Sequence, residues 1–247
     1  MSSAPPDLTS SLLRHERAWV AGGVLLLSLL CWFYLLSGTG LEPMSGMAGM
    51  PPPSLPSTVL MWWLMMGAMM LPSAAPAVML YAQVRRRQIA GGSNIPASWT
   101  FLGGYMLVWL AFSIAAAVVQ LWLAGPDMRI GGARLAAAIL IAVGVYQWSP
   151  VKSACLRHCR SPAQFFARHW RAGPVGAVRL GLLHGTYCVG CCWLLMALLF
   201  AGGVMNLALI ALLTVAVSAE KLLPNGALIA RISGTALIAS GIAVMWS

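Results

Sequence analysis

The chain has 247 residues, of which 60% are hydrophobic and only 8% are charged, and its mean hydropathy is +0.83. Soluble domains carry roughly 25% charged residues, so this composition excludes a soluble globular protein and indicates an integral membrane protein. The formal net charge of +10 would suit a nucleic-acid-binding protein. The positive residues, however, are concentrated in particular loops between long apolar segments, so we expect no nucleic-acid partner.

Seven apolar segments are predicted to be membrane-spanning helices, because about 20 apolar residues cross a hydrocarbon core of about 30 Å and lipid leaves backbone groups no other partners. They cover residues 18–37, 57–81, 100–124, 131–149, 179–201, 204–219 and 227–246, the sixth being the shortest. The predicted fold is an all-α, polytopic transmembrane helical bundle. Residues 18–247 form one domain, and residues 1–17 form a disordered cytoplasmic N-terminus.

The positive residues predict the orientation of the bundle. With the N-terminus inside, thirteen lysines and arginines lie on the cytoplasmic side, and only Arg129 and Arg134 lie outside. We therefore expect the N-terminus inside and the C-terminus outside, with anionic lipid headgroups against the basic face. The first span lacks a small-residue cleavage pattern, which favours a retained anchor; its cleavage would leave six spans in the same orientation.

Methionine is concentrated after the first span. The predicted external loop 38–57, rich in methionine and proline, contains Met44, Met47 and Met50. The second span adds five methionines on one helix face and its flank: Met61, Met65, Met66, Met69 and Met70. Thioethers are soft ligands that favour Cu(I). The alternative is that these side chains only fill gaps or contact lipid.

Pro72 and Pro76 lie in the second span and are expected to interrupt and kink it. A membrane tolerates such a break where the bundle satisfies the exposed backbone, so we expect this span inside the bundle. Glycine and alanine clusters in the third, fourth and seventh spans are expected to be helix-packing faces.

The loop 150–178 is predicted to be cytoplasmic and carries cysteine, histidine and arginine. Cys155 and Cys159 are separated by three residues, one of which is His158. The sequence Ser-Pro-x-Gln at 161–164 predicts a helix start, and the aromatic and arginine residues that follow indicate a short helix on the inner interface.

The fifth span carries soft and borderline metal ligands on one face. At about 100° per residue, four side chains project within roughly a third of the helix circumference: His184, Cys188, Cys191 and Cys192. Met196 follows one turn further on the same side. By depth this face reaches the methionines of the second span near the bilayer centre, so we expect a sulfur-rich intramembrane site between the two spans. The alternative is that each cysteine is a small apolar packing residue.

Glu220 and Lys221 stand at the inner end of the sixth span. An ionisable pair there is worth attention, and its position at the boundary favours an interfacial ion pair over a proton relay.

Three long motifs, at residues 61–76, 146–162 and 181–193, resemble those of a bacterial family of predicted metal-binding integral membrane proteins of unknown function. The similarity extends from about residue 57 to the C-terminus. It implies a multi-pass protein of the bacterial inner (cytoplasmic) membrane with a metal site and no established reaction. The residues that it supports as ligands are Met65, Met66, Met69, Met70, Cys155, Cys159, His184, Cys188, Cys191 and Cys192.

A looser similarity connects the chain with high-affinity copper transporters, which use external methionine motifs, an MxxxM pair in a span and a cytoplasmic His-Cys cluster. Met44, Met47 and Met50, then Met65-x3-Met69, then His158-Cys159 match these three parts in turn. Those transporters are three-span trimers, so the similarity concerns ligands and not fold.

We therefore expect an integral membrane protein that binds a soft transition metal, with Cu(I) favoured and zinc as the other option, and transports or delivers it through methionines to an intramembrane Cys/His site. The candidate ligands are Met44, Met47, Met50, Met65, Met66, Met69, Met70, Cys155, Cys159, His184, Cys188, Cys191 and Cys192. Expected partners are lipid, the metal ion, and a copper chaperone or membrane oxidase; a homo-oligomer is compatible with the sequence.

No catalytic constellation is present, so the chain is not expected to be an enzyme. Two other functions stay open. One is a membrane thiol-redox protein that uses the CxxC pair Cys188 and Cys191. The other is a structural subunit of a membrane complex.

Overall fold

The structure is a computed structural model that describes residues 8–37, 54–90, 98–123 and 132–246. Within these ranges the chain is all-α, as predicted, and contains no β-strand. The helices are α1 (Leu8–Leu36), α2 (Leu55–Ala90), α3 (Ser98–Leu123), α4 (Ala133–Gln147), α5 (Pro150–Arg160), α6 (Pro162–His169), α7 (Gly173–Gly202), α8 (Leu207–Leu222) and α9 (Gly226–Trp246).

Five helices are long and apolar enough to cross a membrane: α1, α2, α3, α7 and α9. α4 and α8, with 15 and 16 residues, are shorter. α4 and α5 pass the same test together as one broken span, which gives up to six crossings in the part of the chain that the structure describes. All seven predicted segments are thus helical, whereas five or six of them qualify as spans. α1 begins ten residues before the predicted first span, so residues 8–17 are helical.

The chain bends by 63° between α4 and α5. Ser149 is the cause, because its side chain caps the new helix by accepting a hydrogen bond from the Lys152 backbone N–H at 3.1 Å, and Pro150 occupies the first turn. Residues 150–178, expected as a loop, therefore hold α5, α6 and the start of α7. The predicted short helix is α6, although the Ser161 side chain makes no capping hydrogen bond.

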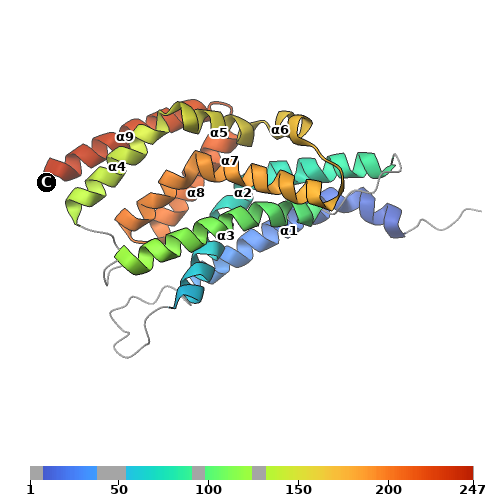
Figure 1. Ribbon diagram of the computed structural model, residues 1–247, viewed down its shortest axis with the longest axis horizontal. Helices are drawn as coiled ribbons and strands as arrows, with labels where there is room; N and C mark the ends of the chain where they lie inside the picture. Colours follow the sequence, from blue (N-terminus) through green and yellow to red (C-terminus); the bar gives the residue numbers. More distant parts are fainter. Residues whose placement is uncertain (1–7, 38–53, 91–97, 124–131, 247) are drawn as a thin grey trace, which may run out of the picture.

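α7 lies in the middle of the bundle and contacts α3, α4, α5 and α8 (Figure 1). α1, α2 and α3 pack as successive neighbours, and α4 runs along α9. Glycines permit close approach of α3 to α7 and of α4 to α9: a Cβ at Gly104 would collide with the Val178 carbonyl oxygen, and one at Gly144 would lie 2.7 Å from the Gly234 carbonyl oxygen. These contacts confirm the packing faces. Gly103, by contrast, has open space around it.

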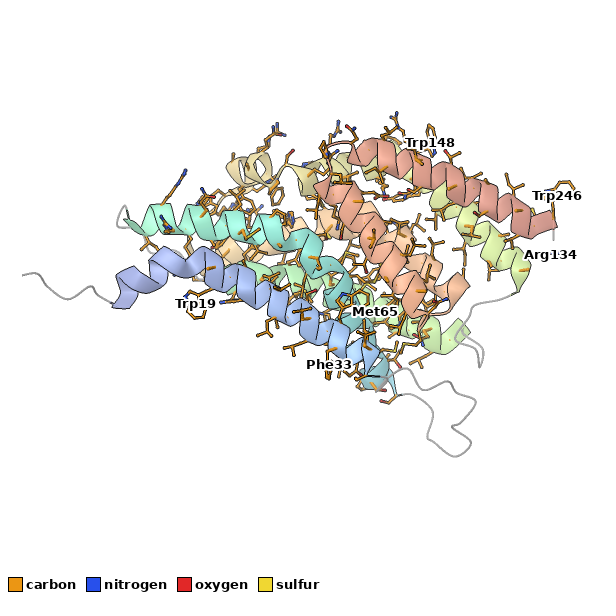
Figure 2. All side chains as sticks on the ribbon, turned by 180° about the vertical axis from the view of Figure 1, so that it is seen from behind. Trp19, Phe33, Met65, Arg134, Trp148 and Trp246 are labelled. Atoms are coloured by element: carbon orange, nitrogen blue, oxygen red, sulfur yellow. The ribbon has the colours of Figure 1, made fainter. Side chains whose placement is uncertain are left out.

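α2 is one continuous helix through Pro72 and Pro76, and it bends near its middle (Figure 2). Pro72 has no N–H to offer the Ala68 carbonyl one turn earlier. Trp32 Nε1 donates to that carbonyl at 3.2 Å, and Ser28 Oγ lies 3.5 Å from it. The prolines therefore bend the helix without interrupting it, and α1 supplies the missing donors.

Candidate metal centre

The metal-ligand face of α7 points into the bundle. Its five side chains are each 3% exposed or less: His184, Cys188, Cys191, Cys192 and Met196. The thiols of Cys191 and Cys192 both donate to the Cys188 carbonyl oxygen, at 3.1 and 3.0 Å. These local bonds hold the two thiols beside the third.

The methionines of α2 are buried against the same region. Met65, Met66, Met69 and Met70 have no exposed surface, and Met61 is 7% exposed. These four thioethers lie on adjoining faces of α2. Because they are completely buried, they pack among other side chains of the bundle and not against lipid.

Two contacts align α2 with α7. The Trp62 and Phe200 rings have centroids 5.1 Å apart, and the Cys192 Sγ lies 4.0 Å from the Met70 Sδ. Eight residues separate these contacts on both helices, from 62 to 70 and from 192 to 200, so the helices are antiparallel. Met66 and Met196 therefore stand at the same level, midway between the contacts. The structure brings the second and fifth predicted spans together.

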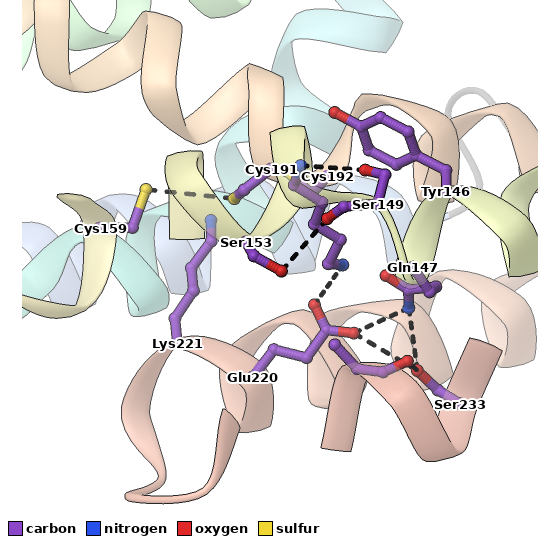
Figure 3. Close-up of polar contacts among 12 residues, drawn as sticks. Tyr146, Gln147, Ser149, Ser153, Cys159, Cys191, Cys192, Glu220, Lys221 and Ser233 are labelled. Carbon is purple, nitrogen blue, oxygen red and sulfur yellow. Dashed lines mark hydrogen bonds and ion pairs between the residues drawn. The ribbon is translucent and has the colours of Figure 1, made fainter. Parts of the chain in front are cut away.

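α5 adds cysteines from a third helix. The Cys159 Sγ lies 4.0 Å from the Cys191 Sγ (Figure 3). Cys155 packs on α7 through Gly190, where an added Cβ would lie 2.9 Å from the Cys155 Sγ. The bend at Ser149 thus sets the two α5 thiols against α7.

We call the following set of side chains the sulfur ladder: Met66, Met196, Met70, Cys192, Cys188, Cys191 and Cys159. Two metal–sulfur bonds of about 2.3 Å span at most about 4.6 Å. The Met70–Cys192 and Cys191–Cys159 sulfur–sulfur distances, both 4.0 Å, can therefore each be bridged by one ion. The ladder joins thioethers to thiols across α2, α7 and α5.

Among the described residues, no three His, Cys, Asp or Glu side chains are grouped to hold a metal ion. A structural zinc site needs four such ligands, so the described donors do not support the zinc expectation. Pairs of thiols and thioethers are soft donors, which suit Cu(I).

His184 brings an unpaired nitrogen to the site. Its Nδ1 is buried and has no hydrogen-bond partner, and its ring lies among Phe101, Tyr105 and Phe165 at centroid distances of 5.4 to 5.9 Å. Buried polar atoms are rarely left unpaired. A free imidazole nitrogen beside buried thiols fits a metal ligand.

Glu220 does not pair with its neighbour Lys221, which corrects the expected interfacial ion pair. Its carboxylate binds Lys152 Nζ at 2.6 Å and Gln147 Nε2 at 2.9 Å, and Ser233 lies next to it (Figure 3). All three charged or amide side chains are buried. Adjacent residues on a helix point about 100° apart, so the two neighbours face different partners.

Lys221 instead points into the sulfur ladder. Its Nζ lies 3.0 Å from the Cys188 Sγ, 3.7 Å from the Met70 Sδ and 3.3 Å from the Ser73 Oγ. The Cys188 Sγ also lies 3.0 Å from the Tyr105 hydroxyl. The sequence interpretation missed Lys221 and Tyr105 as site residues; the signal for Lys221 was an ionisable residue within an apolar stretch.

Not every candidate joins the ladder. Met44, Met47 and Met50 lie outside the described residues. His158, next to Cys159, stacks on Tyr187 with ring centroids 4.1 Å apart and shares a 2.9 Å hydrogen bond with a backbone carbonyl of its own helix. Its role in the structure is packing.

Comparison with known proteins gives one match. The family described as PpoB2, copper chaperone, matches residues 59–244, which include the whole sulfur ladder. No curated protein and no solved structure matches the chain. The match agrees with the resemblance to metal-binding membrane proteins, and the family's description names copper.

Proposed function

Because the chain belongs to the PpoB2 family of copper chaperones, we propose that it is a membrane copper chaperone that accepts Cu(I) and passes it along the sulfur ladder to Cys159. The observation that carries this proposal is the pair of 4.0 Å sulfur–sulfur steps, Met70 to Cys192 and Cys191 to Cys159. They connect three helices by side chains that bind soft metals.

The order of ligands supports a direction for the transfer. At the α2 end of the ladder the ligands are thioethers, which are uncharged when they bind Cu(I). At the α5 end they are thiols, which lose a proton and bind Cu(I) as negatively charged thiolates. An ion therefore gains affinity as it moves from Met66 and Met70 toward Cys159. The C-terminal end of α2, which carries Arg85, Arg86 and Arg87, lies on the same side of the bundle as the start of α7 and the start of α1 (Figure 1). With that side inside, the transfer is inward, and Met44, Met47 and Met50 would receive the ion first.

The acceptor in this proposal takes copper from α5. Cys159 and Cys155 are partly exposed, whereas the thiols of α7 are buried. A soluble copper chaperone or a membrane oxidase could reach only the α5 thiols. The zinc option is left out, because the donors suit a low-coordinate soft ion.

The thiol-redox alternative is less well supported. Cys188 and Cys191 are 2% and 1% exposed, so a partner thiol has no surface to attack. Reactive cysteines of exchange enzymes are partly accessible.

Copper binding tests the proposal. The protein, purified in detergent without oxygen, would be loaded with Cu(I) and compared with Cys192→Ser and Met70→Leu by elemental analysis and competition with a Cu(I) chelator. We expect both variants to bind at least tenfold more weakly, a loss of about 1.4 kcal/mol or more. X-ray absorption should show sulfur neighbours at about 2.3 Å.

Cys31→Ser is the matched control, because it also removes one thiol. Cys31 lies on α1 against Gly67, where an added Cβ would be 3.3 Å from its sulfur, outside the ladder. This variant should bind copper like the wild type. Equal copper affinity in the Cys192 and Met70 variants and the control would reject the ladder as the site.

A further inference from the structure

The chain contains only two lysines, Lys152 and Lys221, beside thirteen arginines. Both lysines are buried, at 1% and 6% exposure. Lys152 has the conventional partner, the carboxylate of Glu220 at 2.6 Å. Among the residues that the structure describes, Lys221 has no carboxylate partner, and its ammonium lies beside two sulfur atoms and one hydroxyl.

Three acceptor atoms from two helices surround the Lys221 ammonium: the Cys188 Sγ of α7 and the Ser73 Oγ and Met70 Sδ of α2. An ammonium has three N–H donors, so this set uses all of them. A thioether is a weak acceptor, and a lysine gains little from it. Two of the three atoms are, however, good ligands for a soft cation.

We propose that Lys221 is a built-in placeholder whose ammonium occupies the position that Cu(I) takes between Met70 and Cys188. The inference rests on the proposed copper transfer and names the residue that tunes it. Cys188 takes part as the thiolate, which pairs with the ammonium before the exchange and with copper after it. Both cations carry one positive charge, so the net charge of the site does not change. Bonds from copper to the two sulfurs form, and the N–H contacts to the same atoms break. No electron moves, and the ammonium keeps its proton.

The position of Lys221 gives the displaced ammonium somewhere to go. The residue is in the last turn of α8, which ends at Leu222, and the next residues, 222–225, are exposed. A lysine near a helix end can extend its charged head to the interface. Return of the ammonium to Cys188 would then favour release of the ion, which a chaperone requires.

Amine labelling tests the exchange in the unmodified protein. The detergent-purified protein would be acetylated with a small amine reagent, without and with one equivalent of Ag(I), a soft monovalent probe, and both lysines would be quantified by mass spectrometry. We expect Ag(I) to raise labelling of Lys221 at least fivefold. Lys152, held by Glu220, is the internal control and should stay unlabelled.

The outcomes separate the two proposals. If Ag(I) binds but labelling of Lys221 is unchanged or falls, the placeholder is rejected and copper transfer stands. If the wild type binds neither Ag(I) nor Cu(I), the proposed function is rejected as well.

Affinity gives a second measurement. Lys221→Leu removes the competing cation without adding a ligand and should raise Cu(I) affinity about tenfold, or about 1.4 kcal/mol. Lys221→Arg keeps a cation at the site and should not show this gain. Weaker binding by Lys221→Leu would mean that Lys221 supports the site, contrary to the inference.

Discussion

Lys152 and Glu220 form an ion pair that is out of contact with solvent. Their side chains are 1% and 2% exposed, and the Nζ to Oε2 distance is 2.6 Å. Gln147 holds the other carboxylate oxygen, so the pair links α4, α5 and α8. Loss of one partner of such a pair leaves a buried charge uncompensated, which costs about 3–5 kcal/mol.

Glu220→Gln should therefore destabilise the protein strongly, by several kcal/mol on that scale. The double variant Glu220→Gln with Lys152→Met should recover part of the loss, since it leaves no unpaired charge there. Thermal unfolding in detergent, at one fixed scan rate, measures both effects. Equal loss in the single and double variants would contradict an interaction between these two side chains.

At this scale the sequence predicts local patterns well and distant partners poorly. The thiols and His184 share a face because helical spacing alone decides it. The contacts of Lys221 could not be foreseen, because Cys188 is 33 residues away and Ser73 is 148 residues away. Only the packing of α8 against α2 and α7 brings them together.

α3 and α7 are held in register by close backbone contact at Gly104. A methyl group there would collide with the Val178 carbonyl oxygen, whereas one at the adjacent Gly103 meets nothing within 4 Å. The two glycines are adjacent in the sequence, but one faces the α7 backbone and the other faces open space. Alanine substitutions at the two positions can therefore be compared directly.

Gly104→Ala should push α3 away from α7, lowering the unfolding temperature and weakening copper binding, because α3 carries Tyr105 against Cys188. Gly103→Ala should be neutral or slightly stabilising, since alanine is favoured over glycine in a helix by about 1 kcal/mol. Thermal unfolding and copper titration of both variants provide the comparison. A greater loss from the Gly103 variant would refute this account of the helix contact.

Helix α5 shows where prediction of the elements was wrong. Residues 150–160 were expected to be loop, because their polar and basic composition lacks an apolar span. The sequence interpretation did not use Ser149-Pro150, although serine followed by proline is typical of a helix start. The helices of the apolar segments were predicted correctly, since hydropathy over about 20 residues is a strong signal.

The two ends of the bundle differ. Figure 2 shows Arg134 and Trp246 at one end and Trp19 at the other. The C-terminus of α9 thus lies opposite the start of α1. This arrangement fits an odd number of crossings, as the positive residues also predict, whereas six crossings would return the C-terminus to the starting side.

A reporter fused after residue 247 tests this orientation. We expect alkaline phosphatase to be active there, because it matures outside the cytoplasm, and a fluorescent protein that requires the cytoplasm to be dark. The reverse result would support six crossings, with α4 and α5 as one broken span.

The burial of the sulfur ladder also bears on the chemical safety of the cargo. Its α7 sulfurs are at most 2% exposed, and Met66 and Met70 have no exposed surface. A reduced copper ion held among these buried sulfurs would have no face open to water, so peroxide in the aqueous phase could not reach it to form radicals. The surrounding helices would then act as insulation for a reactive ion during its passage.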